Sequence, residues 1–309
     1  MLDPLISLLP IYFLLLVGAV SIKTRLVPAD ALPHLSRFAL VICMPVIVAS
    51  AVMRSGDLTE FNWRFIAGYA VAALILLGLG SWIMARVFRL PGALAAMMGM
   101  GMSSANTIFL GYPVGLVLFP DQVDRLFAWI IVAENLAVIP VAIIAAEVLA
   151  GEKGRGFSAS LRQTFGQMTR SPVLIGLVAG LVISGFDIHL PGPVDKTRGL
   201  VAAAAPLIAL FFVGGTVANA QWRETGAPVL AVSFGKLVAH PLLALAVLSL
   251  LPGITPAQAT AGMVFAAMPM FAIFPILSSR YGGAEIASSA LVVTTLLGAV
   301  TVSALVLVI

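Results

Sequence analysis

The sequence contains the same proline-bearing pattern twice, about 161 residues apart. In the first half, Arg37 precedes Pro45 by eight residues (RFALVICMP); in the second, Arg198 precedes Pro206 by the same interval (RGLVAAAAP). The two arginines and the two prolines are each separated by 161 positions (198 − 37 and 206 − 45). Such self-similarity indicates a chain built from two related halves.

A second pair of prolines follows the same offset. Pro113 in FLGYP and Pro275 in FAIFP are 162 positions apart (275 − 113), and both lie inside apolar segments. Prolines that interrupt apolar helices at matching positions of two halves are typical of secondary transporters built from repeats. Transport is therefore the leading functional hypothesis.

The composition is that of a polytopic membrane protein. Hydrophobic residues make up 61% and charged residues 10% of the chain, and the mean hydropathy is +1.11, whereas soluble domains are about 45 to 50% apolar. We expect the lipid bilayer as the main partner. The net charge of +4 comes from basic residues in short loops, which form no stripe, so no nucleic acid is expected.

A span needs about 20 mostly apolar residues, and ten segments meet this need. They are residues 5–22, 32–53, 63–88, 92–119, 125–150, 172–187, 197–218, 226–251, 257–280 and 284–308. The polar stretch 151–170 separates spans five and six and predicts a cytoplasmic connector. Residues 1–150 then form a first five-helix repeat and residues 171–309 a second, which is inverted because five is an odd number.

The basic residues predict the orientation. With both termini outside, eleven of the 17 Lys and Arg residues fall on or near the cytoplasmic side and five on the other, while Lys236 lies inside a span. The positive-inside rule favours this arrangement.

The fourth span reads MMGMGMSSANTIFLGYPVGLVLF, with small and polar residues where a simple anchor would have leucine. Pro113 removes a backbone donor and clashes with the carbonyl four residues back, so we expect freed backbone groups around Phe109. These are tolerated at membrane depth only inside protein or beside a watery cavity. The sequence predicts an interrupted helix and a binding site that includes Asn106, Thr107 and Gly111.

The ninth span contains Pro269 and Pro275, six residues apart. Two interruptions that meet at mid-membrane would direct half-helix N-termini, with their unpaired N–H groups, at one point and favour an anion there. Alternatively, the prolines only kink the helices and the glycines only allow close packing. Asn106, just before the first interruption, favours the binding site.

Several segments resemble the auxin efflux carrier family, especially its bacterial malonate-type transporters. They are NTIFLGYPV, SPVLIGLVAGLVISGFDIHLP, APLIALFFVGGTVA, FGKLVAHPLLA and AAMPMFAIFPILSSRYGG. The resemblance implies an all-α fold of ten helices in a five-plus-five inverted repeat, similar to bile-acid symporters and sodium–proton antiporters. It also implies a bacterial inner-membrane location.

In that architecture, spans one, two, six and seven form a scaffold that often dimerises, which implies a homodimer. Spans three to five and eight to ten form a unit that moves like an elevator, and spans four and nine cross at the substrate site. On this chain the crossing falls at residues 106–113 and 269–275. The second crossing lacks an asparagine equivalent, since an offset of 162 from Asn106 leads to Met268.

Two ionisable residues of span eight lie on one face. Lys236 and His240 are four residues apart. A lysine in the bilayer usually faces a partner, a cavity or a substrate, so both are predicted substrate-binding residues. Lys236 would otherwise extend to the headgroups, and His240, which can respond to a proton gradient, would otherwise be a packing residue.

Glu134 and Asn135 lie in span five. A carboxylate there can carry a proton or a cation, because it can be neutral when buried and charged when wetted. We therefore assign ion coupling to this pair, with H⁺ or Na⁺ as the ion. A structural ion pair between Glu134 and Lys236 would explain the two charges equally well.

The resulting prediction is a secondary active transporter for a small organic anion, such as malonate or an auxin-like weak acid, that works by alternating access. The sequence has no nucleotide-binding loop, so we do not expect the protein to use ATP. It also has no HExxH and no GxSxG motif, so we expect no enzymatic activity, no bound metal and no cofactor. The alternative is a symporter or antiporter of the bile-acid or cation–proton type. A pair of mid-membrane acids would favour it, and Glu134 is the one clear acid.

Overall fold

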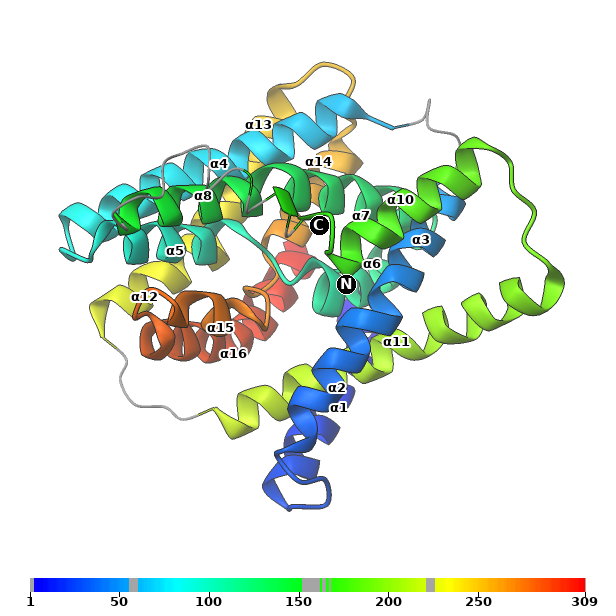
Figure 1. Cartoon of the computed structure of the whole chain (residues 1–309), viewed down its shortest axis with the longest axis horizontal. Helices are drawn as coiled ribbons and strands as arrows, with labels where there is room; N and C mark the ends of the chain where they lie inside the picture. The colour runs from blue at the N-terminus through cyan, green and yellow to red at the C-terminus, as the bar shows by residue number, and fades with distance from the viewer. Residues whose placement is uncertain are drawn as a thin grey trace. The chain divides into compact units, whose positions relative to one another are not determined.

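The computed structural model describes residues 3–55, 61–151, 162, 165–166, 168–220 and 226–308. All regular elements within these ranges are helices (Figure 1). The α-helices are α1 (Asp3–Lys23), α2 (Ala31–Phe38), α3 (Met44–Arg54), α4 (Trp63–Arg86), α5 (Gly92–Ser103), α6 (Tyr112–Leu118), α7 (Val123–Ala133), α8 (Ile139–Ala150), α10 (Pro172–Gly185), α11 (Gly192–Asn219), α12 (Ala227–Phe234), α13 (His240–Leu250), α14 (Pro256–Ala266), α15 (Phe274–Ser279) and α16 (Ala284–Val308).

Eight helical stretches of the described residues are long and apolar enough to cross a membrane. The chain is therefore a polytopic all-α membrane protein, as predicted. The other two predicted spans differ from a simple helix of full length: α10 has 14 residues, and the ninth span consists of α14 and α15 with a non-helical stretch between them. The count of ten spans stays a prediction.

Within the described residues, four π-helical turns precede prolines. Each ends two residues before a proline, and the four are Ala39–Cys43 before Pro45, Thr107–Gly111 before Pro113, Glu134–Val138 before Pro140 and Gly235–Ala239 before Pro241. Proline has no N–H and clashes with the carbonyl four residues back. A wider turn, in which Ile139 N–H bonds to Glu134 O five residues back, lets the helix continue past the proline. Pro206, the predicted counterpart of Pro45, instead lies inside α11.

The first of two compact units comprises Met1–Asn62, Ile108–Trp129 and Gln167–Asn219. Within it α1 packs along α11, and α3 along α10. Glycines permit the first contact: a Cβ on Gly18 would overlap the backbone of Phe211, and one on Gly214 would overlap the backbone of Leu15. Small residues that let two backbones approach are the usual basis of helix association in membranes.

The second unit comprises Trp63–Thr107, Ile130–Gly166 and Ala220–Ile309. Its central element is α5, whose residues from Ala93 to Ser103 are all buried and which packs against α4, α8, α12 and α15. Methionines dominate this core, and Met97, Met98 and Met100 are at most 1% exposed. Because methionine fills irregular gaps, it suits a helix enclosed on several sides.

The two units are assembled from both predicted halves of the chain. Unit 1 contains spans one, two, six and seven, with 108–129 added, and unit 2 contains most of the remaining spans. The spans of unit 1 include the four that the family resemblance assigns to the scaffold, and unit 2 holds most of those that it assigns to the moving part. The movement itself stays a prediction. The division into repeats 1–150 and 171–309 stays a prediction, and most of the predicted connector 151–170 lies outside the described residues.

The α1–α11 contact gives a stability prediction. Gly214→Leu places a side chain against the backbone of Leu15 and should lower the free energy of unfolding by about 1 to 3 kcal/mol, as overpacking does. Gly199→Leu is the matched control, because it lies in the same helix with nothing within 4 Å of its Cβ position. Unfolding of the purified variants in detergent measures both, and equal stabilities would contradict the proposed backbone contact.

Candidate functional site

The fourth span is interrupted before its proline. Helix α5 ends at Ser103, Ser104 is extended with φ −111° and ψ 135°, and helical structure resumes at Thr107. The interruption was predicted around Phe109, but Phe109 lies within the π-helical turn. Pro113 follows this turn within a helical stretch that continues to Leu118, so the proline does not interrupt the span.

The ninth span is interrupted over residues 267–273, which contain Pro269. Pro275 lies in the first turn of the helix that follows, α15. The N–H of Asn106 donates a hydrogen bond of 2.7 Å to the carbonyl of Pro269. Both interruptions are buried, since Asn106 is 3% and Met268 1% exposed. The two predicted breaks therefore meet inside unit 2.

The carboxylate of Glu134 bonds to the backbone just after α5. Its Oε1 accepts from the N–H of Ala105 at 3.0 Å, and its Oε2 accepts from the hydroxyl of Thr107 at 2.8 Å. Thr107 begins the second half-helix of the span, whose N-terminal end carries partial positive charge. The predicted coupling residue thus contacts a predicted substrate-binding residue.

Lys236 bonds to the other interrupted span. It is fully buried, and its Nζ lies 2.8 Å from Nδ1 of His240 and donates to the carbonyl of Ala266 at 2.9 Å. Ala266 is the last residue of α14, so the ammonium lies at the partially negative end of that helix. With its charge engaged here, Lys236 does not extend to the headgroups. The imidazole of His240 packs edge-on to Tyr69 at 5.9 Å, and its Nε2 has no hydrogen-bond partner among the described residues.

Glu134 and Lys236 interact without touching. Each contributes to the electrostatic environment of the other, yet within the described chain no ion pair of 4.0 Å or less joins them. The direct ion pair considered from the sequence is therefore not formed. Each charge instead stabilises the end of one half-helix, Glu134 in span four and Lys236 in span nine.

The backbone donors at the first interruption are not free. The sequence predicted unpaired N–H groups, but Ala105 donates to Glu134 and Asn106 donates to Pro269. A buried amide without a partner costs as much as a lost hydrogen bond, so protein groups satisfy it. An anion that binds here has to replace one of these partners.

The structure does not bring all predicted site residues together. Asn106, Thr107, Pro269, Lys236, His240, Glu134 and Pro275 belong to unit 2, whereas Gly111 and Pro113 belong to unit 1. Asn135 donates from its side chain to the carbonyl of Ile131 in its own helix, at 3.0 Å. Asn135 therefore makes a local contact within its own helix.

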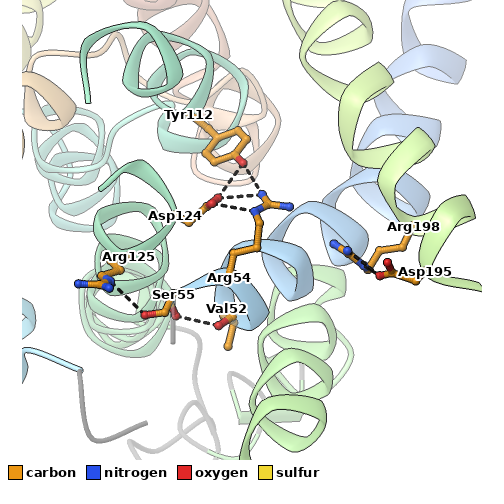
Figure 2. Close-up of polar contacts among 8 residues, drawn as sticks. All are labelled: Val52, Arg54, Ser55, Tyr112, Asp124, Arg125, Asp195 and Arg198. Atoms are coloured by element: carbon orange, nitrogen blue, oxygen red, sulfur yellow. Dashed lines mark hydrogen bonds and ion pairs between the residues drawn. The ribbon is translucent and has the colours of Figure 1, made fainter. Parts of the chain in front are cut away.

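Sequence reasoning missed a polar cluster in unit 1, shown in Figure 2. Arg54 at the end of α3 donates to both carboxylate oxygens of Asp124 at 2.7 and 2.8 Å, and Tyr112 donates to Asp124 at 2.9 Å. Arg54 was counted only as an orientation charge. The sequence signal for this cluster was the presence of a basic residue, Arg54, and an acidic residue, Asp124, at the ends of different spans. In the same view Arg198 pairs with Asp195 in its own helix.

Comparison with known proteins identifies the family of the chain. The family model described as "Membrane transport protein" matches residues 4–306. A protein named "Putative malonate transporter" from Rhizobium meliloti (strain 1021) is 25% identical over 303 residues, which covers 96% of this chain and 93% of that protein. No group of three or more metal-ligating side chains occurs in the part of the chain that the structure describes.

The separation of Glu134 and Lys236 predicts partial energetic coupling. Glu134→Gln and Lys236→Met should each destabilise the protein, and the double variant should lose less than the sum by about 1 kcal/mol, because removing one charge reduces the cost of removing the other. The unfolding free energies of the wild type, both single variants and the double variant, measured in detergent, give the coupling energy of this double-mutant cycle. The control cycle pairs Lys236→Met with Glu147→Gln, whose carboxylate accepts from Tyr281 at 3.0 Å, and should be additive within about 0.5 kcal/mol. Equal coupling in both cycles would refute a specific interaction.

Proposed function

Because this chain belongs to the Membrane transport protein family, we propose that it is a secondary active transporter of small organic carboxylates. The main support is the 2.7 Å hydrogen bond from the N–H of Asn106 to the carbonyl of Pro269, which joins two interrupted spans in a buried part of unit 2. Non-helical backbone at membrane depth occurs where it is enclosed by protein or lines a cavity. The proposed substrate site lies beside this bond.

The side chains around the crossing support an anionic substrate. Asn106 and Thr107 supply an amide and a hydroxyl, and Lys236 and His240 supply an ammonium and an imidazole. Within unit 2, the non-helical backbone around Pro269, followed by Pro275 in the first turn of α15, borders the proposed site. Gly111 and Pro113 lie in the helix that follows Thr107 and stay predicted site residues. The similarity to a protein named for malonate supports a carboxylate such as malonate, and an auxin-like weak acid has the same group.

The division into units supports an elevator-like form of alternating access. The bonds of Glu134, Lys236 and Asn106 described above are all internal to unit 2. A moving unit that carries its own binding site needs this property. Unit 1, with its glycine-mediated contacts between long helices, would be the stationary part, and we propose that its spans one, two, six and seven form a homodimer.

The second candidate is a coupled symporter or antiporter of the bile-acid or cation–proton type. The buried carboxylate of Glu134 favours ion coupling, with H⁺ or Na⁺ as the ion and Asn135 as a neighbouring polar group. A cation site needs several oxygen ligands, however. Both oxygens of Glu134 already accept hydrogen bonds, which argues against a Na⁺ site at this carboxylate and leaves H⁺ as the coupling ion for a carboxylate transporter.

We further propose a bacterial inner-membrane location, with both termini outside and an inverted five-plus-five arrangement. Alkaline phosphatase, which folds only outside the cytoplasm, should be active when fused after Ile309 and inactive when fused within 151–170. Activity at both positions would place an even number of spans between them and exclude five spans in the second half.

Asn106 gives the sharpest test of the substrate site. Asn106→Ala should reduce uptake of labelled malonate into liposomes at least tenfold, because the side chain lies at the joined interruptions. Asn219→Ala is the control, since Asn219 is exposed at the end of α11 in unit 1. Both variants are compared at equal amounts of folded protein. Normal uptake by Asn106→Ala would remove Asn106 from the site.

A further inference from the structure

Glu134 shows which ligand chemistry the first interruption accepts. Its two carboxylate oxygens are each held by one donor, the N–H of Ala105 at 3.0 Å and the hydroxyl of Thr107 at 2.8 Å. All three residues are at most 5% exposed. Hydrogen bonds to an ionised oxygen are about twice as strong as neutral ones. The pair of donors is therefore a built site for one carboxylate.

Neighbouring groups strengthen this assignment. Helical structure is continuous from Thr107 through Leu118, so the donors lie at the N-terminal end of three turns, where an anion is stabilised. Directly beside Ala105, the hydroxyl of Ser104 is 1% exposed and has no hydrogen-bond partner among the described residues. The Ser104 hydroxyl is therefore a buried polar group that Glu134 does not use.

We propose that Ala105 N–H and the Thr107 hydroxyl form the carboxylate-binding site of the transporter, and that Glu134 and the substrate occupy it alternately. The inference rests on the proposed function and specifies its site. Glu134 holds the donors when it is ionised. When Glu134 takes up a proton it releases them, and a substrate carboxylate binds to the same two groups.

The charges around Glu134 explain why the exchange involves a proton. The titratable groups near it are Tyr69 on α4, whose hydroxyl has no partner among the described residues, and Lys236, which contacts His240. One carboxylate and one ammonium leave this buried cluster without net charge, when His240 and Tyr69 are neutral. Two carboxylates on the same donors would add an uncompensated charge at membrane depth, which is costly. A proton on Glu134 keeps the balance for the one substrate carboxylate that takes these donors.

The mechanism couples one proton to one bound carboxylate. The proton comes from water and ends on a Glu134 oxygen, the bonds to Ala105 and Thr107 break, and the substrate carboxylate forms the corresponding bonds. The reverse exchange, in which Glu134 loses the proton and retakes the donors, expels the substrate. Proton and carboxylate therefore bind together and leave together.

The test is titration of purified wild-type protein with malonate by calorimetry, in two buffers of different ionisation enthalpy. We expect uptake of about one proton per malonate, and an affinity that falls about tenfold per pH unit where Glu134 is ionised, as linkage requires. Glu134→Gln keeps the shape of the side chain but cannot ionise. It should bind malonate with no proton uptake and without this pH dependence.

Two further variants complete the design. Glu147→Gln removes an acid from the same span that bonds to Tyr281, and it should behave as the wild type does. Thr107→Val removes one of the two donors and should weaken malonate binding at least tenfold. The number of protons that the wild type takes up per bound malonate is measured without any variant. The proposal therefore stays testable even if Glu134→Gln does not fold.

The outcomes separate this inference from the proposed function. If wild-type protein neither binds nor transports malonate or related carboxylates, the proposed function is refuted. If it transports them but takes up no proton on binding, or if Glu134→Gln keeps the proton uptake, carboxylate transport stands and the exchange at Glu134 is overturned. Coupling to an imposed sodium gradient alone would also overturn it.

Discussion

The requirement that buried backbone groups be hydrogen-bonded governs this structure more than any other constraint. A helix that stops inside a membrane exposes amides and carbonyls that water does not reach. Here three backbone groups at the two interruptions have protein partners: Glu134 for the N–H of Ala105, the carbonyl of Pro269 for the N–H of Asn106, and Lys236 for the carbonyl of Ala266. These bonds stabilise the interruptions.

The prolines act in two different ways. Four of them follow a π-helical turn and leave the helix continuous, whereas the stretches that lose helical structure are Ser104–Asn106 and the residues around Pro269. Widening the turn removes the clash of the proline ring without exposing the backbone to lipid. Two π-helical turns carry the charged residues of the cluster, since Glu134 begins one and Lys236 is the second residue of another. A wider turn changes the direction of the side chains that follow, which contributes to where these charges lie.

Hydropathy and proline positions were sufficient to predict the helical class, the positions of most spans and the interruptions of the fourth and ninth. The family resemblance, drawn from short segments, is confirmed by a match over residues 4–306. The break in the fourth span was predicted around Phe109, a few residues after its observed position at 104–106. The prediction assumed that Pro113 breaks the helix, whereas a π-helical turn keeps the helix continuous there. The contacts of Glu134 with Thr107, 27 positions away in sequence, and of Arg54 with Asp124, 70 away, depend on tertiary packing that no local pattern encodes.

In the proposed exchange, the same bonds of the unit 2 cluster serve stability and substrate binding. If the half-helix ends were left open, the anion affinity would be high but the empty site would be costly to bury. An internal carboxylate removes that cost and lowers the apparent affinity for a substrate by the free energy needed to displace it. A transporter needs such a compromise, because a ligand that binds too tightly is not released. In the proposed exchange, the placement of Glu134 on the donors of Ala105 and Thr107 sets this balance, and the charge of Lys236 at the opposing helix end compensates one carboxylate on these donors.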